Sequence, residues 1–456
     1  MDLLAAAKEA VAGATAAGAG SADALALERR ETSLTIRRGD LETSQEAETR
    51  GVGVRAFRGG RSGIAYTTDL TPESLRRAGR QAADLAALAG MDPAAGLPDP
   101  AFRGAPAAVE GIDDPDYESV EASRGIAMAK EGEAAAFAAD RRVVNSEGTQ
   151  FEAARQRTAL AASDGFEARS QRTRYSLAVM ALAEDEGGAL QRDGWYTCSP
   201  ILARLDPPEA VGREAARRCV RRLGWRKVET RRVPVVFSPE VAAAFAGEVA
   251  RACCGDALFR GASFLADSLG EAVASPLLTL VDDPLLAGGL GSRPFDAEGA
   301  RPARKAVLDR GILRSFLFDS FSLRKTAAAF PARAAGGTPG NATRGLGGPT
   351  AVGTSNLFVE AGAETPEAVI GAVQDGFYVT ETLGFGVNTA TGDYSKGAAG
   401  LWIRDGALGH AVQEVTIAAD LRAMLRGVAA VGNDLEFRSS VSAPTIRIAE
   451  MTVSGN

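Results

Sequence analysis

Two long runs of alternating polar and apolar residues, separated by three turn residues, constrain the fold of this chain most strongly. The runs cover Gln150 to Ala162 and Phe166 to Glu184, and Ser163-Asp164-Gly165 lies between them. A period of two places alternate side chains on opposite faces of a strand, and an Asp-Gly pair favours a tight turn. The pattern therefore predicts an extended antiparallel hairpin.

A second group of strands is predicted between residues 25 and 68. Runs with strand-like alternation are separated there by Gly39-Asp40 and by Gly59-Gly60. Such pairs are typical of turns between neighbouring strands. This segment is therefore expected to form a meander of three or four antiparallel strands.

Helices are expected to accompany these strands. Thr71 as a cap and Pro72 at the first helical position predict a helix that covers the sheet. Two more helices are predicted, from Tyr117 to Ala139 and from Pro208 to Gly224. The apolar stripe of the first helix consists of Leu75, Ala78, Ala82, Leu85 and Ala89.

The C-terminal half is dominated by strand patterns. Val233 to Phe237 reads as a strand, and a helix is expected to follow from Ser238, with a buried stripe of Val241, Phe245, Val249 and Ala252. Further helices are predicted at residues 321–330, 366–374 and 421–428. Ala334 to Gly353 is so rich in Gly, Thr and Pro that we expect a mobile surface loop near a site. The remaining predicted strands cover residues 277–281, 306–308, 312–318, 356–359, 377–382, 398–404, 408–418 and 445–453.

The length of the chain predicts two domains. Its 456 residues exceed the roughly 250 to 300 residues at which a single core usually stops growing. Residues 91–115 are rich in Pro, Gly and Ala, which is typical of a linker. We predict an α+β fold. The N-terminal α+β domain is predicted to cover residues 1–228, with subsegments 1–110 and 111–228, and to contain an antiparallel sheet, helices and the long hairpin. The β-rich C-terminal domain is predicted to cover residues 229–456 and to contain packed antiparallel sheets and a few helices.

Charge and cysteine usage narrow the function classes. The net charge is -7 and charges of both signs are interspersed, whereas nucleic-acid binding needs clustered basic residues. The basic run from Arg217 to Arg232 is interpreted as a solvated helix end. Four cysteines without CxxC spacing indicate reduced thiols. With no signal peptide or long apolar segment recognised, we expect a soluble, cytoplasmic protein without nucleic-acid or membrane partners.

A glycine-rich loop near the C-terminus is the most informative segment for function. It lies between predicted strands, where a fold can display polar groups beside a rigid sheet. These groups could bind a peptide backbone or a second subunit; alternatively, they could satisfy the backbone of their own loop. The candidate binding residues are Asn388, Thr391, Asp393, Tyr394 and Ser395.

The segment around this loop resembles the C-terminal signature of the TldD/PmbA family. The resemblance rests on GxGVNxxTGDYSxGAxGxWI from Gly384 to Ile403, VxEVTIAxxL from Val412 to Leu421, and VGNDxExR from Val431 to Arg438. The family, once called modulators of DNA gyrase, is regarded as zinc-dependent peptidases, and the match is closest to its PmbA/TldE branch. The resemblance implies that residues 229–456 form a TldD/PmbA-type domain.

The same resemblance implies that this chain lacks the zinc site of the TldD branch, whose members carry HExxxH on the helix predicted after Ser238. The corresponding positions are Ala246, Gly247 and Arg251, and His410 is the only histidine in the chain. A histidine-based zinc site needs more than one imidazole. We therefore expect no catalytic or metal-binding residue here, with zinc held by a TldD-like partner.

Other candidate groups on or near that helix have simpler interpretations. Glu248 is interpreted as a solvated carboxylate, and Cys253 and Cys254 as one buried and one partly buried thiol, since adjacent helical residues point about 100° apart. His410 is interpreted as a surface residue of a strand, and Trp402 as a core residue. An oxygen-ligand site for Mg²⁺, Ca²⁺ or Mn²⁺ remains open at Asp282, Asp283 or Asp393.

Three functions remain open at this point. The resemblance implies a PmbA/TldE-like subunit of a TldD-TldE-type metalloprotease, inactive alone, that shapes the cleft for unfolded or extended peptides. The alternative is a homodimeric, non-catalytic peptide-binding or scaffolding protein. A third possibility is an autonomous hydrolase that uses carboxylates and an oxygen-bound metal. The absence of GxSxG and of GxxxxGK[ST] gives no support to a serine hydrolase or a nucleotide-binding protein.

Overall fold

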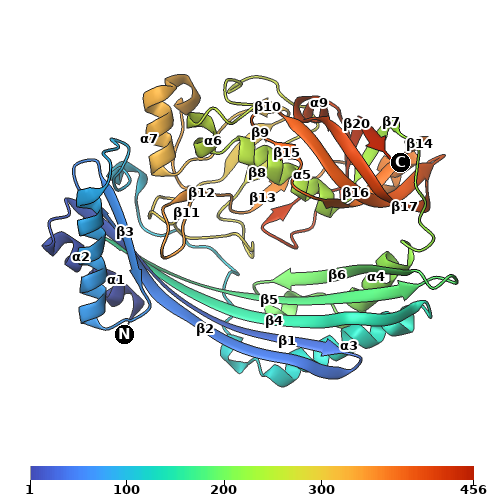
Figure 1. The fold of residues 1–456 in the computed structure, drawn as a ribbon, viewed down its shortest axis with the longest axis horizontal. Helices are drawn as coiled ribbons and strands as arrows, with labels where there is room; N and C mark the ends of the chain where they lie inside the picture. The colour runs from blue at the N-terminus through green and yellow to red at the C-terminus, as the bar shows by residue number, and fades with distance from the viewer. Residues whose placement is uncertain (1, 456) are drawn as a thin grey trace.

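A curved, six-stranded antiparallel sheet forms the base of the computed structural model, which describes residues 2–455 (Figure 1). The strands lie in the order β3-β2-β1-β4-β5-β6, and β4 and β5 pair over almost their full length. The predicted meander and the predicted hairpin are both confirmed, and Gly165 occupies the turn with φ 92°. The strands are β1 Ser21–Arg37, β2 Asp40–Phe57, β3 Ser62–Thr67, β4 Val143–Ala162, β5 Glu167–Glu184 and β6 Leu190–Ser199.

Four helices cover one face of this sheet. They are α1 Leu3–Ala16, α2 Pro72–Leu88, α3 Ala122–Ala139 and α4 Pro208–Val220. The helices α1 and α2 pack on β1 and β2 through small buried side chains such as Ala24 and Val54. The helices α3 and α4 pack on β4 and β5 around Phe151 and Leu177. The opposite face of the sheet is directed toward the C-terminal region (Figure 1).

Several predicted boundaries in the N-terminal half need correction. Leu85 is exposed, and Ala86 continues the buried stripe of α2 instead. The helix α3 begins only at Ala122, because a short 3-10 turn, Tyr117–Ser119, precedes it. The sequence analysis did not predict α1 or β6. Alanine makes up half of the helix α1 and lies on both of its faces, so its buried and exposed faces differ little in hydrophobicity.

Five C-terminal strands pair in a closed ring. The order of pairing is β14-β7-β20-β17-β16, and β16 pairs again with β14. The pairing of β7 with β14 is parallel, and the others are antiparallel. Helix α5, Pro239–Ala252, packs its predicted stripe into the adjoining core, and Trp402 is buried there as expected. The strands of this sheet are β7 Arg231–Phe237, β14 Asp375–Leu383, β15 Val387–Asn388, β16 Asp393–Arg404, β17 Ala407–Asp420, β18 Val428–Val431 and β20 Ile446–Ser454.

A smaller sheet and short helices complete the C-terminal region. The smaller sheet has the order β10-β9-β8-β13-β19, and a separate hairpin, β11 with β12, lies within residues 334–353. Asn341 and Ala342 of that segment are buried, while its mobility stays a prediction. The elements are β8 Leu280–Asp282, β9 Lys305–Asp309, β10 Ile312–Leu313, β11 Ala342–Thr343, β12 Ala351–Val352, β13 Leu357–Val359, β19 Val441–Ser442, α6 Gly255–Phe259, α7 Ser320–Ala329, α8 Pro366–Gly371 and α9 Leu421–Arg426. Further 3-10 turns cover Pro100–Phe102, Leu202–Arg204 and Pro331–Ala334.

The strand predicted at residues 312–318 is shorter than expected. Only Ile312 and Leu313 form it, and Leu317 makes just an isolated bridge to Cys254. Phe316, Leu317 and Phe318 are all buried, and a continuous apolar run does not distinguish a strand from buried irregular chain. The α+β class is confirmed. The predicted subsegments 1–110 and 111–228 share one sheet, because β1 pairs with both β2 and β4, and the domain division at residue 228 stays a prediction.

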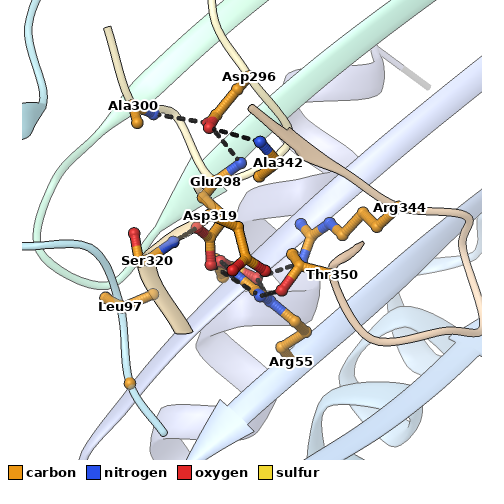
Figure 2. A network of polar contacts seen from close by, with 12 residues as sticks. Arg55, Leu97, Asp296, Glu298, Ala300, Asp319, Ser320, Ala342, Arg344 and Thr350 are labelled. Atoms are coloured by element: carbon orange, nitrogen blue, oxygen red, sulfur yellow. Dashed lines mark hydrogen bonds and ion pairs between the residues drawn. The ribbon is translucent and has the colours of Figure 1, made fainter. Parts of the chain in front are cut away.

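A buried ionic network joins the sheet to the C-terminal region (Figure 2). Arg55 on β2 pairs with Asp23 on β1 at 2.5 Å and with Glu298 at 3.1 Å, and Arg344 Nη1 lies 2.7 Å from the second oxygen of Asp23. Glu298 also accepts a hydrogen bond from the backbone N–H of Ser320. Burial alone would raise the pKa of Asp23, but the charges of Arg344 and Arg55 hold it well below its usual range. These contacts fix the sheet against the C-terminal region.

No helix within residues 2–455 combines the length and the apolar character that crossing a membrane requires.

Candidate functional site

The glycine-rich loop between β14 and β16 displays four of the five predicted site residues on the surface. Asn388, Thr391, Asp393 and Ser395 are exposed. Three of them also bond within the loop. Asn388 Oδ1 accepts from the backbone N–H of Ala390 at 3.0 Å, and Thr391 Oγ1 donates to Asp393 Oδ2 at 2.6 Å. The loop is therefore held in a defined shape with polar groups facing outward, so both the binding and the architectural interpretations have support.

Tyr394, the fifth predicted residue, points the other way. Its side chain is 3% exposed and belongs to the C-terminal core. Burial, together with the nearby charge of Glu248, raises the pKa of its hydroxyl. Tyr394 and Asp393 are neighbours on β16, and successive residues of a strand face opposite sides. The tyrosine therefore positions the loop from beneath and is not presented on its outer surface.

Helix α5 lies beneath this loop and carries an ion-paired carboxylate. Glu248 is 9% exposed, so the interpretation as a solvated carboxylate is wrong. Its carboxylate lies 3.2 Å from Lys396 Nζ of β16 and 3.1 Å from Arg251 Nη2. Lys396 is 148 residues distant in the chain, so a local pattern could not reveal the pair.

The residues on α5 do not fit a zinc ion. Ala246 and Gly247 offer no ligand, and Arg251 with Lys396 places two positive charges around Glu248. Zinc in proteins is bound by thiolate, imidazole and carboxylate groups, and adjacent cations oppose a divalent ion. Across residues 2–455 no three His, Cys, Asp or Glu side chains lie close enough together to hold a metal ion.

The alternative oxygen-ligand site also finds little support in the geometry. Asp282 is buried and already accepts hydrogen bonds on both carboxylate oxygens. Its Oδ1 accepts from Ser355 N and Oγ at 2.6 and 2.9 Å, and its Oδ2 accepts from Asn341 Nδ2 at 2.7 Å. Asp283 caps the turn at Leu285, and Asp393 lies in the distant loop. The carboxylate of Asp282 therefore acts as a structural acceptor between strands.

Both thiols at the end of α5 are buried, so the expectation of one partly buried thiol is wrong. Cys253 is completely buried, and Cys254 is 7% exposed. Burial raises the pKa of Cys253 to about 12, and it also raises the pKa of Cys254.

These thiols are expected to react with a disulfide reagent at pH 8 only after denaturation. A pKa of about 12 in place of 9.0 lowers the thiolate population, and with it the reaction rate, by roughly a thousandfold. The other two cysteines, Cys198 and Cys219, are buried as well. Counting the thiols modified by Ellman's reagent with and without urea checks this. Rapid modification of the folded protein at Cys253 or Cys254 would contradict it.

His410 lies on β17 with its side chain exposed, as the sequence analysis predicted for a surface strand. Partial burial and the neighbouring charges of Arg226 and Arg404 lower its pKa.

The tip of the loop also exposes two large apolar side chains that the sequence analysis did not single out. Leu383 is 57% exposed, and Phe385 is fully exposed. Gly386 follows, and a Cβ there would lie 1.6 Å from the carbonyl oxygen of Ser395, so only glycine fits. The sequence feature that could have indicated this exposed tip is a phenylalanine between two glycines. Exposed aromatic groups beside polar ones are typical of protein-contact surfaces.

The outer edge of the six-stranded sheet is a second candidate contact surface. Strand β6 pairs only with β5 within the described chain, so its other edge has backbone groups free of strand pairing. Beside it, a cavity of about 260 Å³ is lined by Trp195 and Tyr196 of β6 and by Glu436 and Arg438 of the C-terminal motif. The Arg438 guanidinium lies 5.1 Å from the Trp195 ring centre. Sheet edges and neighbouring pockets are used to bind extended peptides.

Three family models match successive parts of the chain. A PmbA/TldA metallopeptidase domain 1 matches residues 22–86, the central domain matches residues 115–223, and the C-terminal domain matches residues 230–455. The chain is similar to Metalloprotease PmbA of Escherichia coli O157:H7, with 33% identity over 98% of this chain and 96% of that protein. It is also similar to the Metalloprotease PmbA homolog of Haemophilus influenzae, with 32% identity over 97% and 94% of the two chains.

Solved structures share the whole fold. A Bacteroides thetaiotaomicron protein described as a modulator of DNA gyrase superposes with a TM-score of 0.89 at 27% identity, over 99% of this chain and 98% of that one. TldE from Thermococcus kodakarensis superposes with a TM-score of 0.83 at 20% identity, over 98% and 99%. Because its sequence identity is only 20%, the second match supports a shared fold and nothing more.

Proposed function

Because this chain belongs to the TldD/PmbA family of metallopeptidases, we propose that it is the PmbA/TldE-like subunit of a two-component peptidase. Its relatives carry the name metalloprotease, which supports a peptidase-related role. In this proposal the zinc ion and the hydrolytic step belong to a TldD-like partner. The chain itself shapes the cleft that receives unfolded or extended peptides.

The cationic surroundings of Glu248 on α5 carry this proposal. A metallopeptidase helix places two imidazoles on one face and a glutamate beside the metal-bound water. On α5 the glutamate is held by Lys396 and Arg251. Ala246, Gly247 and Arg251 supply no imidazole to hold a metal beside this carboxylate, which is ion-paired to two cations instead. The helix therefore serves better as a support for the loop above it than as a catalytic element.

Two surfaces support the peptide and partner roles. The free edge of β6 offers backbone hydrogen bonds to an extended chain, which gives affinity with little dependence on sequence. The loop tip, with Phe385 and the polar groups around Asp393, is suited to contact a second subunit. A homodimer that uses the same loop is the second candidate, because an exposed apolar tip fits a copy of the chain as well as a relative.

Replacing Asp393 with alanine is expected to weaken assembly or peptide binding about tenfold while costing at most about 1 kcal/mol of folding free energy. The side chain is exposed and, among residues 2–455, is hydrogen-bonded only to Thr391. Asp84→Ala on α2 is the matched control, since that carboxylate is exposed on a helix far from the loop.

Assembly is measured by affinity purification of each variant from the native host. Mass spectrometry then identifies the proteins that co-purify with it. The proposal expects a TldD-like protein carrying HExxxH to accompany the wild-type chain and Asp84→Ala, and to be depleted for Asp393→Ala. Recovery of the chain only with copies of itself would favour the homodimer. Unchanged assembly and peptide binding by Asp393→Ala would assign the loop to architecture.

A further inference from the structure

A cluster of arginines lines the sheet face that is directed toward the C-terminal region. Arg29 of β1 is in register with Gln156 of β4, which is in register with Arg172 of β5. Arg174 lies two residues further along β5 and therefore on the same face. Arg293 reaches the same place from the segment before β9. We refer to Arg29, Arg172, Arg174 and Arg293 as the arginine cluster.

The arginine cluster borders two adjoining cavities between the sheet and the C-terminal region. Their volumes are about 150 and 180 Å³, and both are lined by Gln156, Arg172 and Ser292. Arg29 and Arg174 line the first cavity, and Arg293 lines the second. A water molecule occupies roughly 30 Å³ in the liquid, and each cavity is several times larger. Each cavity therefore has room for a side chain that ends in a carboxylate group.

Three members of the cluster have no carboxylate partner within 4.0 Å in the described part of the chain. Arg172 donates to the amide oxygen of Gln156 at 3.2 Å, and Arg174 to the sulfur of Cys198 at 3.2 Å. Arg293 donates only to backbone carbonyl oxygens, at 3.3 and 3.5 Å. Arg29 alone has an acidic partner, Glu31 at 2.8 Å.

This arrangement contrasts with the buried ionic network at the other end of the same face, where Arg55 is neutralised by two carboxylates. In the arginine cluster, Arg172 faces the like charges of its three neighbours, while Asp296 beside Arg293 and the carboxylates of Glu152 and Glu31 near Arg174 act without a contact within 4.0 Å. Enclosure in the groove and the charges of Arg293, Arg29 and Arg174 lower the pKa of Arg172. The Nε atoms of Arg29 and Arg293 are buried without a hydrogen-bond partner. An anion would relieve the repulsion and supply the missing acceptors.

We propose that the arginine cluster binds the carboxylates of an extended acidic peptide, so that the peptides received by this chain are rich in Asp and Glu. This inference rests on the proposed peptide-binding function and specifies its substrate class. Guanidinium groups bind carboxylates through two parallel hydrogen bonds, which adds geometric selectivity to charge. The adjoining cavities offer several such groups along one line of the sheet.

An acidic peptide fits better than a nucleic acid. The chain carries a net charge of -7, which repels a long polyanion at distances beyond the groove. Arg29 and Arg293 are only half-exposed and line cavities between the sheet and the C-terminal region, whereas backbone phosphates are usually bound along an open basic strip. A short flexible chain with spaced carboxylates can enter such a groove.

Fluorescence anisotropy with two labelled ten-residue peptides tests the inference on the full chain. One peptide has Glu at alternate positions, and its twin has Gln at the same positions. The Glu peptide is expected to bind the wild-type protein at least about tenfold more tightly, with a preference that falls as salt is added. The variant Arg172→Gln/Arg174→Gln should reduce that preference to less than about threefold.

Arg169→Gln is the matched control. Arg169 lies on the same strand but on the opposite face, where it pairs with Asp2 at the surface, so the preference should be retained. Circular dichroism verifies that each variant is folded. If the double variant does not fold, the preference for the Glu peptide is measured with the single variant Arg172→Gln. Arg172 and Arg174 are both exposed residues, which makes either variant tolerable to the fold.

The possible outcomes separate this inference from the function on which it rests. Equal binding of both peptides, or an unchanged preference in the double variant, would overturn the acidic specificity and leave peptide binding intact. No binding of either peptide would overturn both. Tighter binding of a labelled single-stranded oligonucleotide than of the Glu peptide would replace the peptide with a nucleic acid as the ligand of the cluster.

Discussion

The isolated chain should leave an unfolded, casein-like substrate uncleaved, and the same chain mixed with a TldD-like protein should cleave it. Enzymes accelerate such hydrolyses by a factor of at least about 10⁶, so a protein without an activated nucleophile gives no detectable product. The helix that would carry a metal site has Glu248 paired to Lys396 and Arg251 instead. The expected difference between chain and mixture is therefore close to all-or-none.

Gel analysis of substrate over time measures this cleavage, with each protein alone and in equimolar mixture. Chelation with EDTA should abolish the activity of the mixture, because the zinc-activated water would be lost. A partner with the first histidine of HExxxH replaced by alanine is the matched control and should be inactive in the mixture. Robust, EDTA-sensitive cleavage by the isolated chain would contradict the proposal and favour an autonomous hydrolase.

Replacing Arg55 with alanine is expected to lower the free energy of unfolding by about 3 to 5 kcal/mol. Arg55 is buried and pairs with both Asp23 and Glu298, so its removal leaves the buried Glu298 without its cationic partner and Asp23 with Arg344 alone. Figure 2 shows Arg55, Glu298 and Arg344. Urea unfolding of wild type and variant measures the loss. Arg50→Ala on the same strand is the control. Its side chain is 58% exposed, and a change of no more than about 0.5 kcal/mol is expected there.

The cost of Arg55→Ala should decrease in acid. The pKa of Asp23 is lowered in the folded protein, so its stabilising contribution is complete above the unfolded pKa of about 3.9 and is lost as the pH falls. Protonated Asp23 and Glu298 no longer need a cationic partner. A difference between wild type and variant that stayed constant from about pH 5 to pH 2, or equal losses for Arg55→Ala and Arg50→Ala, would contradict the role of the network.

Elements in which apolar residues recur at a regular spacing were predictable from the sequence. The hairpin of β4 and β5 follows from strict alternation and an Asp-Gly turn, and the buried stripe of α5 follows from four-residue spacing. The helix α1 was missed because alanine serves on both of its faces. The strand β6 was missed because its apolar and polar residues do not alternate regularly.

The site was predictable only as far as local patterns reach. Four of the predicted loop residues are exposed and their role stays a prediction, but Tyr394 was grouped with Asp393 although neighbours on a strand face opposite sides. The partner of Glu248 and the arginine cluster depend on which strands lie side by side. Lys396 is 148 residues from Glu248, and Arg29 meets Arg172 only through the register of β1, β4 and β5. Contacts of this kind are decided by tertiary packing.

The ring of strands β14, β7, β20, β17 and β16 has no terminal strand, because its last member pairs with its first. Within the described residues, only the short strands β15 and β18 pair with members of this ring from outside, with β16 and β20 respectively. In the proposed function, contacts at the turn that carries Phe385 would involve its exposed aromatic side chain, whereas the free edge of β6 would pair with the backbone of an extended chain. If both surfaces act as proposed, side-chain chemistry would attach the partner and backbone pairing would hold the peptide, so that a change of partner could evolve without altering peptide binding.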